Sequence, residues 1–441
     1  MDQFANLIAV IFIAHYLWSY YWNCYRKGYS MDIWHFSLLF NLFVIHIMLP
    51  FSRSDLNVFA LGPGLLRRTQ SHVTEAYLIS AFGYAGILIG GSLWRIRLRL
   101  GIRSAFSRWI EFPARGSFLL LSSKPLLILH GTVAIALLAS IVAFYFKTEG
   151  FGFNLRGLLL VMPALRPIAQ FAAFYSVLIA SYCLVRFVVF KERSMLPIIA
   201  LIVCGLLFFG ERGNIFAIAM LTIIGTFIRM GRRLKLVWLV AGTVGALCLV
   251  FLLDGLRNPN FSLAAVVGGF ALNMFYGNSF SDTRDFAVIL SFWDGHFLWG
   301  KTYLAGLIAF VPRVLSSFRD TWAIGVVTAT MAGFKTTEHP GLRVGIFGEA
   351  YLNFGLVGVF LLSLLIGSTM RLVDMRMKQS AALLPKNDVR IFSYYLITLP
   401  IAVAQNSSVA STFYTIMLVI GLSWVVQRIA RGIADSPLIK P

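Results

Sequence analysis

Charged residues are scarce in this chain. Only 13% of the 441 residues are Asp, Glu, Lys or Arg, and 59% are hydrophobic. A soluble domain typically has about 25% charged and about 45–50% apolar residues. Several apolar runs reach the roughly 18 residues that a membrane-spanning helix needs. The scarcity of charge therefore excludes an ordinary soluble protein and predicts an all-α, polytopic integral membrane protein.

The sequence also lacks the motifs of several chemistries. It contains no P-loop, dinucleotide fingerprint, HExxH or GxSxG, so nothing indicates a nucleotide-driven pump. Its four cysteines and seven histidines are scattered, and no metal-ligand spacing is evident among them. We therefore expect no metal or other cofactor, and cysteines that serve as small apolar helix residues.

Acidic residues are scarcer than basic ones, 18 against 38, which gives a net charge of +20. The excess is not evenly distributed. We expect about eleven spans, near 4–22, 31–50, 73–93, 125–146, 168–190, 195–210, 214–228, 236–253, 344–370, 391–405 and 410–426. The connecting segments on one side then hold 23 of the basic residues. The positive-inside rule places that side in the cytoplasm, the N-terminus outside and the C-terminus inside. The charge thus reports topology rather than a nucleic-acid partner.

The first span lacks a basic leading segment and a small-residue cleavage site, so we expect a retained helix. Residues 195–228 are apolar between two basic flanks, which requires a hairpin rather than a single crossing. Its turn, Gly210–Asn214, contains Arg212. Each leg of about 15–16 residues would span roughly 24 Å, less than a full bilayer core, so we expect Arg212 to be recessed in a cavity open to the outside.

The predicted outer face has one large element, residues 254–343, between the eighth and ninth spans of a single membrane domain. Its apolar stretches predict a partly helical loop at the membrane surface. Aromatic residues gather near Asp294 and His296. They are typical of interfacial anchoring, with a platform on which a sugar ring stacks as the alternative.

Ionisable side chains on this outer face are the candidates for chemistry. Guanidinium groups bind phosphate oxygens in pairs, and a carboxylate can take a proton from an attacking hydroxyl. Charged residues at membrane depth are costly and are functional candidates by default, which favours Arg212 and Glu349. The other candidates are Arg284, Arg313, Arg343, Asp282 and Asp285.

Two blocks of sequence carry a resemblance to a known family. GKTYLAGLIAFVPR (Gly300–Arg313) and FGEAYLNFGLVG (Phe347–Gly358) resemble blocks of the bacterial O-antigen polymerases (Wzy-type) and related oligosaccharide repeat-unit polymerases. The GERGN turn and the SDTRDF stretch resemble the family's arginine-bearing turn and acidic/basic stretch. After Pro-Arg the chain departs from the family pattern, and Arg319 is the expected substitute cation.

The resemblance implies a metal-independent glycosyltransferase of the bacterial inner membrane. Such an enzyme moves growing glycan from an undecaprenyl-pyrophosphate carrier onto the next lipid-linked repeat unit at the periplasmic face. Arg212, Arg313 and Arg284 would bind pyrophosphate, and Arg343 would draw the carrier phosphate inward. Glu349 would be the general base or would orient an arginine. Tyr351 and Asn353 would shape the site, with Asp282 and Asp285 as further base candidates.

The resemblance also implies partners: membrane lipids, a chain-length regulator and a flippase. An O-antigen ligase would use the same donor with a lipid A-core acceptor, and a lipid-linked oligosaccharide flippase would also need a basic cavity. A transporter should show paired inverted repeats or broken helices, and none is evident. The GExYxNFG block favours the polymerase.

Overall fold

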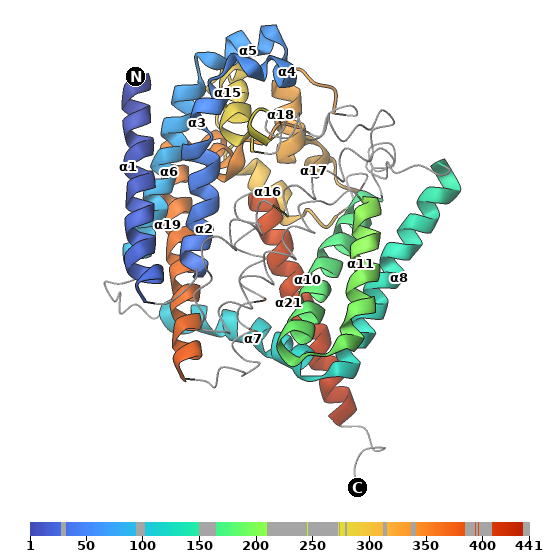
Figure 1. The fold of residues 1–441 in the computed structure, drawn as a ribbon. Coiled ribbons are helices and arrows are strands. Elements are labelled where there is room, and N and C mark those ends of the chain that lie inside the picture. Colours follow the sequence, from blue (N-terminus) through green and yellow to red (C-terminus); the bar gives the residue numbers. More distant parts are fainter. Residues whose placement is uncertain are drawn as a thin grey trace. The chain divides into compact units, whose positions relative to one another are not determined.

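The protein is represented by a computed structural model. It describes residues 1–27, 32–93, 102–149, 165–209, 245, 272, 274–277, 280–311, 315–336, 341–383, 393, 396 and 408–434. All the regular secondary structure in these ranges is helical (Figure 1). The chain divides into two compact units, the first formed by Met1–Arg97, Leu247–Leu372 and Ala404–Thr412, and the second by Leu98–Ala246, Val373–Val403 and Phe413–Pro441.

Six helical segments in the described part are long and apolar enough to cross a membrane: Asp2–Tyr25, Val73–Leu93, Lys124–Lys147, Ile168–Phe187, Gly345–Met375 and Val409–Arg431. They agree with six of the expected spans. Two shorter apolar helices, Ile33–Ile47 and Arg193–Leu206, coincide with two more. The expected spans 214–228, 236–253 and 391–405, and the Gly210–Asn214 turn, lie outside the described residues except for 245, 393 and 396. The structure thus agrees with a helical membrane protein.

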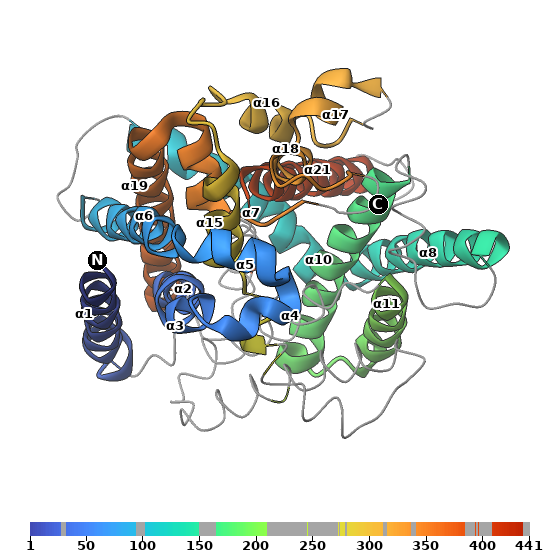
Figure 2. The same ribbon diagram turned by 90° about the horizontal axis from the view of Figure 1, so that it is seen from above.

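The first unit contains the N-terminal helices and the described part of the expected outer loop. Its elements are α1 (Asp2–Tyr20), η1 (Tyr21–Tyr25), α2 (Ile33–Leu42), η2 (Phe43–Ile47), α3 (Leu49–Ser52), η3 (Asp55–Asn57), α4 (Val58–Leu61), α5 (Pro63–Gln70), α6 (Val73–Leu93), α15 (Asp282–Phe292), α16 (Lys301–Leu307), α17 (Ser317–Trp322), α18 (Ile324–Met331), most of α19 (Gly345–Leu383) and the start of α21 (Val409–Ala434). Helices α1, α2, α6 and α19 run side by side (Figures 1 and 2).

Glycines allow α6 and α19 to approach closely. A Cβ at Gly86 would lie 2.7 Å from Cβ of Ser363, and a Cβ at Gly90 would overlap the backbone of Leu364. The Ser368 hydroxyl donates to the carbonyl of Gly90 at 3.1 Å. Small residues at such spacing are a common device for packing membrane helices, because apolar attraction between helices is weak in lipid. This contact fixes α19, and with it the FGEAYLNFG block.

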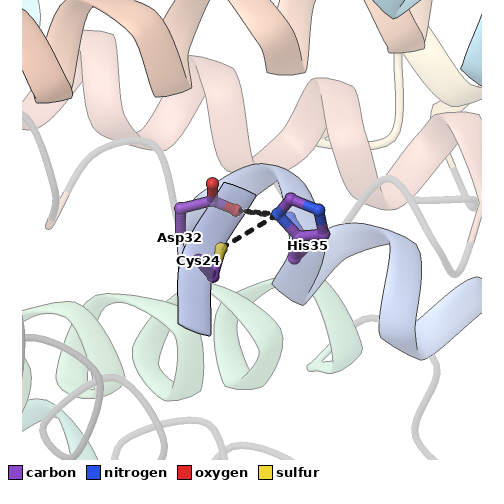
Figure 3. Close-up of side chains that lie close together, drawn as sticks. All are labelled: Cys24, Asp32 and His35. Carbon is purple, nitrogen blue, oxygen red and sulfur yellow. Dashed lines mark hydrogen bonds and ion pairs between the residues drawn. The ribbon is translucent and has the colours of Figure 1, made fainter. Parts of the chain in front are cut away.

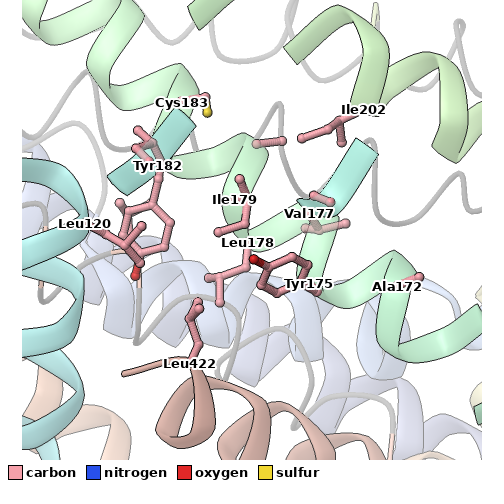
Figure 4. Close-up of a cluster of buried hydrophobic side chains, with 14 of the residues drawn as sticks. Leu120, Ala172, Tyr175, Val177, Leu178, Ile179, Tyr182, Cys183, Ile202 and Leu422 are labelled. Atoms are coloured by element: carbon pink, nitrogen blue, oxygen red, sulfur yellow. The ribbon is translucent and has the colours of Figure 1, made fainter. Parts of the chain in front are cut away.

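The second unit consists of α7 (Ile102–Ser122), α8 (Lys124–Glu149), α10 (Arg166–Phe190), η5 (Arg193–Met195), α11 (Leu196–Phe209) and the rest of α19 and α21. Its core is apolar, with Leu120, Ile179 and Leu422 among its members (Figure 4). The structure places α7 where a basic loop was expected. Arg186 of α10 is neutralised locally, since it donates to Glu192 and to the carbonyl of Leu121.

Candidate functional site

The described site residues from the sequence analysis lie in the first unit, around the start of α19. They form two groups. The Glu349 cluster contains Glu349, Asn353, Thr302, Gly300 and Val409. The Asp282 cluster contains Asp282, Asp285, Arg284, Arg343 and Ser281. The two clusters differ in burial and in the partners of their carboxylates.

Glu349 is fully buried, with 0% of its surface exposed. One carboxylate oxygen accepts from the Thr302 hydroxyl at 3.1 Å, and the other accepts from the backbone N–H of Val409 at 2.9 Å. Both oxygens therefore have a donor inside the protein, as a buried carboxylate requires. No described arginine pairs with it. In this arrangement Glu349 joins three segments: α19, α16 and the start of α21.

Asn353 lies one turn after Glu349 and is equally buried. Its amide nitrogen donates to the Thr302 hydroxyl oxygen at 2.7 Å, and its amide oxygen accepts from the Gly300 N–H at 2.9 Å. Thr302 thus links Asn353 to Glu349 in one hydrogen-bonded chain. Such networks fix the relative position of the elements that contribute to them.

The glycine of the Asn-Phe-Gly sequence, Gly355, interrupts the helix. Its φ is +64° and its ψ is −156°, a conformation that interrupts α19 and that is essentially restricted to glycine. The interruption leaves carbonyls of the preceding turn without helical partners. The Leu352 carbonyl instead accepts from the Leu298 N–H at 2.9 Å, and the Asn353 carbonyl from the Trp299 N–H at 3.1 Å. The break therefore docks the loop before α16 onto α19.

The Asp282 cluster lies at the N-terminus of α15. Asp285 accepts from the Ser281 hydroxyl at 2.8 Å, from a guanidinium nitrogen of Arg284 at 3.3 Å and from the Arg343 N–H at 3.3 Å. Arg284 also donates to the carbonyl of Tyr276 at 2.7 Å. Arg284 and Asp285 are both buried, so this pair orients the cluster rather than presenting charge to solvent.

Asp282 and Arg343 are the accessible members of the cluster. The Arg343 Nε lies 3.8 Å from a carboxylate oxygen of Asp282, and 53% of the Arg343 side chain is exposed, against 18% for Asp282. Burial, opposed by Arg343 and reinforced by Asp285, raises the pKa of Asp282 to about 6. This carboxyl group can therefore gain and lose a proton near neutral pH.

A small cavity borders Asp282. Its volume of about 20 Å³ is enough for a single water molecule, and its polar lining residues are Asn41, Ser80, Asp282 and Thr283. Gly345 (φ +64°), at the start of α19, also lines the cavity, and a Cβ there would meet the Asp282 carboxylate at 3.4 Å. The positive φ therefore favours glycine at this position.

Tyr351 connects this region to the aromatic residues of the expected loop. Its ring centroid lies 5.4 Å from that of Trp293 and 6.0 Å from that of Phe286. The ring centroid of Trp293 lies 5.4 Å from that of Phe297, which in turn lies 5.9 Å from that of Trp299. Trp299 is 72% exposed. The aromatic series therefore extends from the buried site to the surface.

The structure thus brings seven of the nine predicted site residues into the two clusters and the aromatic series. Arg212 and Arg313 lie outside the described residues. Arg319, the expected substitute cation, donates to the carbonyl of Val311. Sequence analysis did not single out Thr302, although it lies in the quoted block GKTYLAG and its hydroxyl links Glu349 to Asn353.

Comparisons with known proteins give no further guidance. No protein-family model, no curated protein and no solved structure matches the chain.

Proposed function

We propose that this protein is a polysaccharide polymerase of the bacterial inner membrane, as in O-antigen biosynthesis. It transfers growing glycan from undecaprenyl-pyrophosphate to a lipid-linked oligosaccharide repeat unit. The pairing of Arg343 with Asp282 carries this proposal. It combines an exposed cation that can bind phosphate with a neighbouring carboxyl group whose pKa of about 6 suits proton transfer.

The proposal includes a membrane arrangement. About eleven helices span the bilayer, with the N-terminus in the periplasm and the C-terminus in the cytoplasm, as the distribution of basic residues favours. Residues 254–343 form the large periplasmic loop between the eighth and ninth spans. The start of α19, and both clusters with it, then face the periplasm, where lipid-linked repeat units are joined.

In the transfer step, a hydroxyl of the acceptor repeat unit attacks the anomeric carbon of the donor glycan. Asp282 accepts the hydroxyl proton, the new glycosidic bond forms, and the bond to the carrier pyrophosphate breaks. Arg343, with Arg212 and Arg313, stabilises the negative charge on the departing pyrophosphate. The step uses no metal ion, because the arginines supply the positive charge.

The remaining residues position this machinery. Arg284 holds Asp285, and Asp285 accepts from the backbone of Arg343. Glu349 and Asn353 hold the loop before α16, with its exposed Trp299, against α19. Trp299 and Phe297 offer aromatic faces on which sugar rings of the acceptor could stack. Glu349 is assigned a positioning role, because both its oxygens already have donors within the protein.

Deletion of the gene, followed by sizing of the surface polysaccharide, tests the proposal. Single repeat units capped on the lipid A-core are expected. Lipid-linked polymer that accumulates without transfer would instead identify a ligase, and precursors trapped at the inner face would identify a flippase. A polymerase should also depend on a flippase for its substrate and on a chain-length regulator for product size, so loss of either partner should change the polysaccharide.

A further inference from the structure

A second group of polar side chains lies away from the two clusters. Cys24 lies in η1, Asp32 precedes α2, and His35 lies in the first turn of α2 (Figure 3). All three are buried, with exposed fractions of 0%, 3% and 0%. Their sulfur, oxygen and nitrogen atoms lie within 4.8 Å of one another. The proposed glycan transfer makes no use of them.

Both ring nitrogens of His35 have polar partners. Its Nδ1 lies 2.7 Å from the Asp32 carboxylate and 3.2 Å from the Cys24 sulfur, so one ring nitrogen faces two groups (Figure 3). Its other nitrogen, Nε2, lies 3.0 Å from the Ser19 hydroxyl. A neutral imidazole carries a proton on only one nitrogen. With the proton on Nδ1, His35 donates to Asp32 and accepts from the Ser19 hydroxyl at Nε2. With the proton on Nε2, His35 donates to Ser19, and the lone pair of Nδ1 points toward the Cys24 sulfur and the Asp32 carboxylate, where a cation can take the place of a proton.

We propose that Cys24, Asp32 and His35 bind a divalent cation of the Zn²⁺ class. Thiolate, imidazole and carboxylate are the three zinc ligand types of proteins. A cation between the three atoms accepts a lone pair from each. Ser19 then accepts the hydrogen bond from the outer nitrogen of a metal-ligating histidine, the arrangement that normally fixes its tautomer and orientation. The proposal does not depend on the function proposed above.

Charge and size are compatible with this assignment. A thiolate and a carboxylate together neutralise the two positive charges of Zn²⁺, so the buried site acquires no net charge. Ordinary zinc bonds measure about 2.0–2.3 Å. The Asp32 oxygen and the Cys24 sulfur lie 2.7 and 3.2 Å from Nδ1, and each needs to move away from it by only about half an ångström to reach tetrahedral spacing around zinc.

The site would join α1 to α2. Cys24 belongs to the helical segment that continues α1, whereas Asp32 caps α2 by accepting the His35 N–H at 2.7 Å. Tyr16 of α1 also donates to the His35 carbonyl at 3.1 Å. A bound cation would therefore stabilise the packing of these two helices, and its removal would lower the stability of the protein.

Metal loading of the purified full-length protein tests the assignment. After treatment with a chelator, the protein is titrated with Co²⁺ as a spectroscopic probe and, separately, with Zn²⁺. We expect one equivalent of either metal, a Co²⁺–thiolate charge-transfer band, and a higher melting temperature with Zn²⁺ than with chelator. C24S should lose the charge-transfer band. Ser19→Ala should weaken binding by about 10–100-fold, because it removes the acceptor for the outer nitrogen.

Cys204→Ser is the matched control, since Cys204 is an exposed cysteine of α11. It should retain the band and the stoichiometry. If C24S does not fold, the wild-type melting temperature with zinc and with chelator still decides. Three results would overturn the assignment: less than stoichiometric metal in the wild type, a band that persists in C24S, or a melting temperature that zinc leaves unchanged. Covalent labelling of Ser19 by a fluorophosphonate would also overturn it, because Ser19 would then be a nucleophile activated by His35.

Discussion

The Glu349 and Asp282 clusters are each built around a carboxylate, but the two carboxylates differ in access to solvent. Glu349 has no exposed surface, and both its carboxylate oxygens accept hydrogen bonds from protein donors. Asp282 borders a small cavity beside the half-exposed Arg343. A carboxylate whose two oxygens both accept from protein donors holds segments together, whereas one beside an accessible cation can exchange a proton with a ligand. In the proposed mechanism, Glu349 therefore has a structural role and Asp282 a chemical one.

The sharpest test of this difference is a matched pair of substitutions. Asp282→Asn should lower the rate of glycan chain growth by about 10²–10⁴-fold, the usual contribution of a general base, with the melting temperature retained. Glu349→Gln should instead lower the melting temperature and leave the transfer rate per folded molecule unchanged. Its amide nitrogen would face one of two donors, the Thr302 hydroxyl or the Val409 N–H, which costs about 1–3 kcal/mol of stability.

Chain growth in membrane vesicles, normalised to folded protein, measures the first effect, and thermal unfolding measures the second. The proposed division fails if Glu349→Gln abolishes transfer per folded molecule, or if Asp282→Asn leaves the transfer rate unchanged.

Much of the fold was predictable because hydropathy and length are local properties. The expected span 73–93 coincides with α6, and 168–190 lies within α10. Helix α7 was not predicted, because its basic residues assigned it to a connecting loop. Its apolar residues recur with helical periodicity on one face, and its polar residues lie on the other. Such an amphipathic helix is not recognised by a search for uniformly apolar runs.

The candidate site was only partly predictable. The sequence could place Glu349 and Asn353 on one face of a helix, because residues four apart are neighbours. It could not reveal that Thr302 and Val409 occupy the Glu349 oxygens, since these partners lie 47 and 60 residues away. The grouping of Cys24 with Asp32 and His35 was missed for a similar reason. Its spacing matches no common metal motif, and only the packing of η1 against α2 brings the cysteine to the histidine.

Substitution of Gly355, at the break in α19, should have a moderate effect on stability. Gly355→Ala should destabilise the protein by about 1–3 kcal/mol, because alanine strongly disfavours φ +64° with ψ −156°. The added Cβ would also press on the Phe297 ring at 3.1 Å. Thermal unfolding measures the change. Gly421→Ala in α21 is the matched control, since nothing lies within 4 Å of its added Cβ, and it should be neutral or slightly stabilising. Equal effects of the two substitutions would show that the break does not need glycine.

The smallest effect concerns the pH dependence of transfer. The pKa of Asp282 is about 6, raised from 3.8 chiefly by burial, and Arg343 lowers it. If ionised Asp282 is the base, transfer should increase as the pH rises through about 6. Arg343→Gln removes the neighbouring positive charge, so the pKa and the midpoint of this increase should move to higher pH. Arg343→Lys should keep most of the wild-type profile, although lysine lacks the second nitrogen for phosphate.

Stability should change with pH in the opposite direction. The folded protein holds the Asp282 proton more tightly than the unfolded chain, so stability should fall as the pH rises from about 4 to about 6 and then level off. In Arg343→Gln this fall should extend to higher pH. The midpoint of the transfer profile could instead stay the same in Arg343→Gln while the stability profile moves. Asp282 would then not be the group that accepts the proton in the rate-determining step. Proton transfer would then have to be assigned to another residue, while Arg343 kept its role with phosphate.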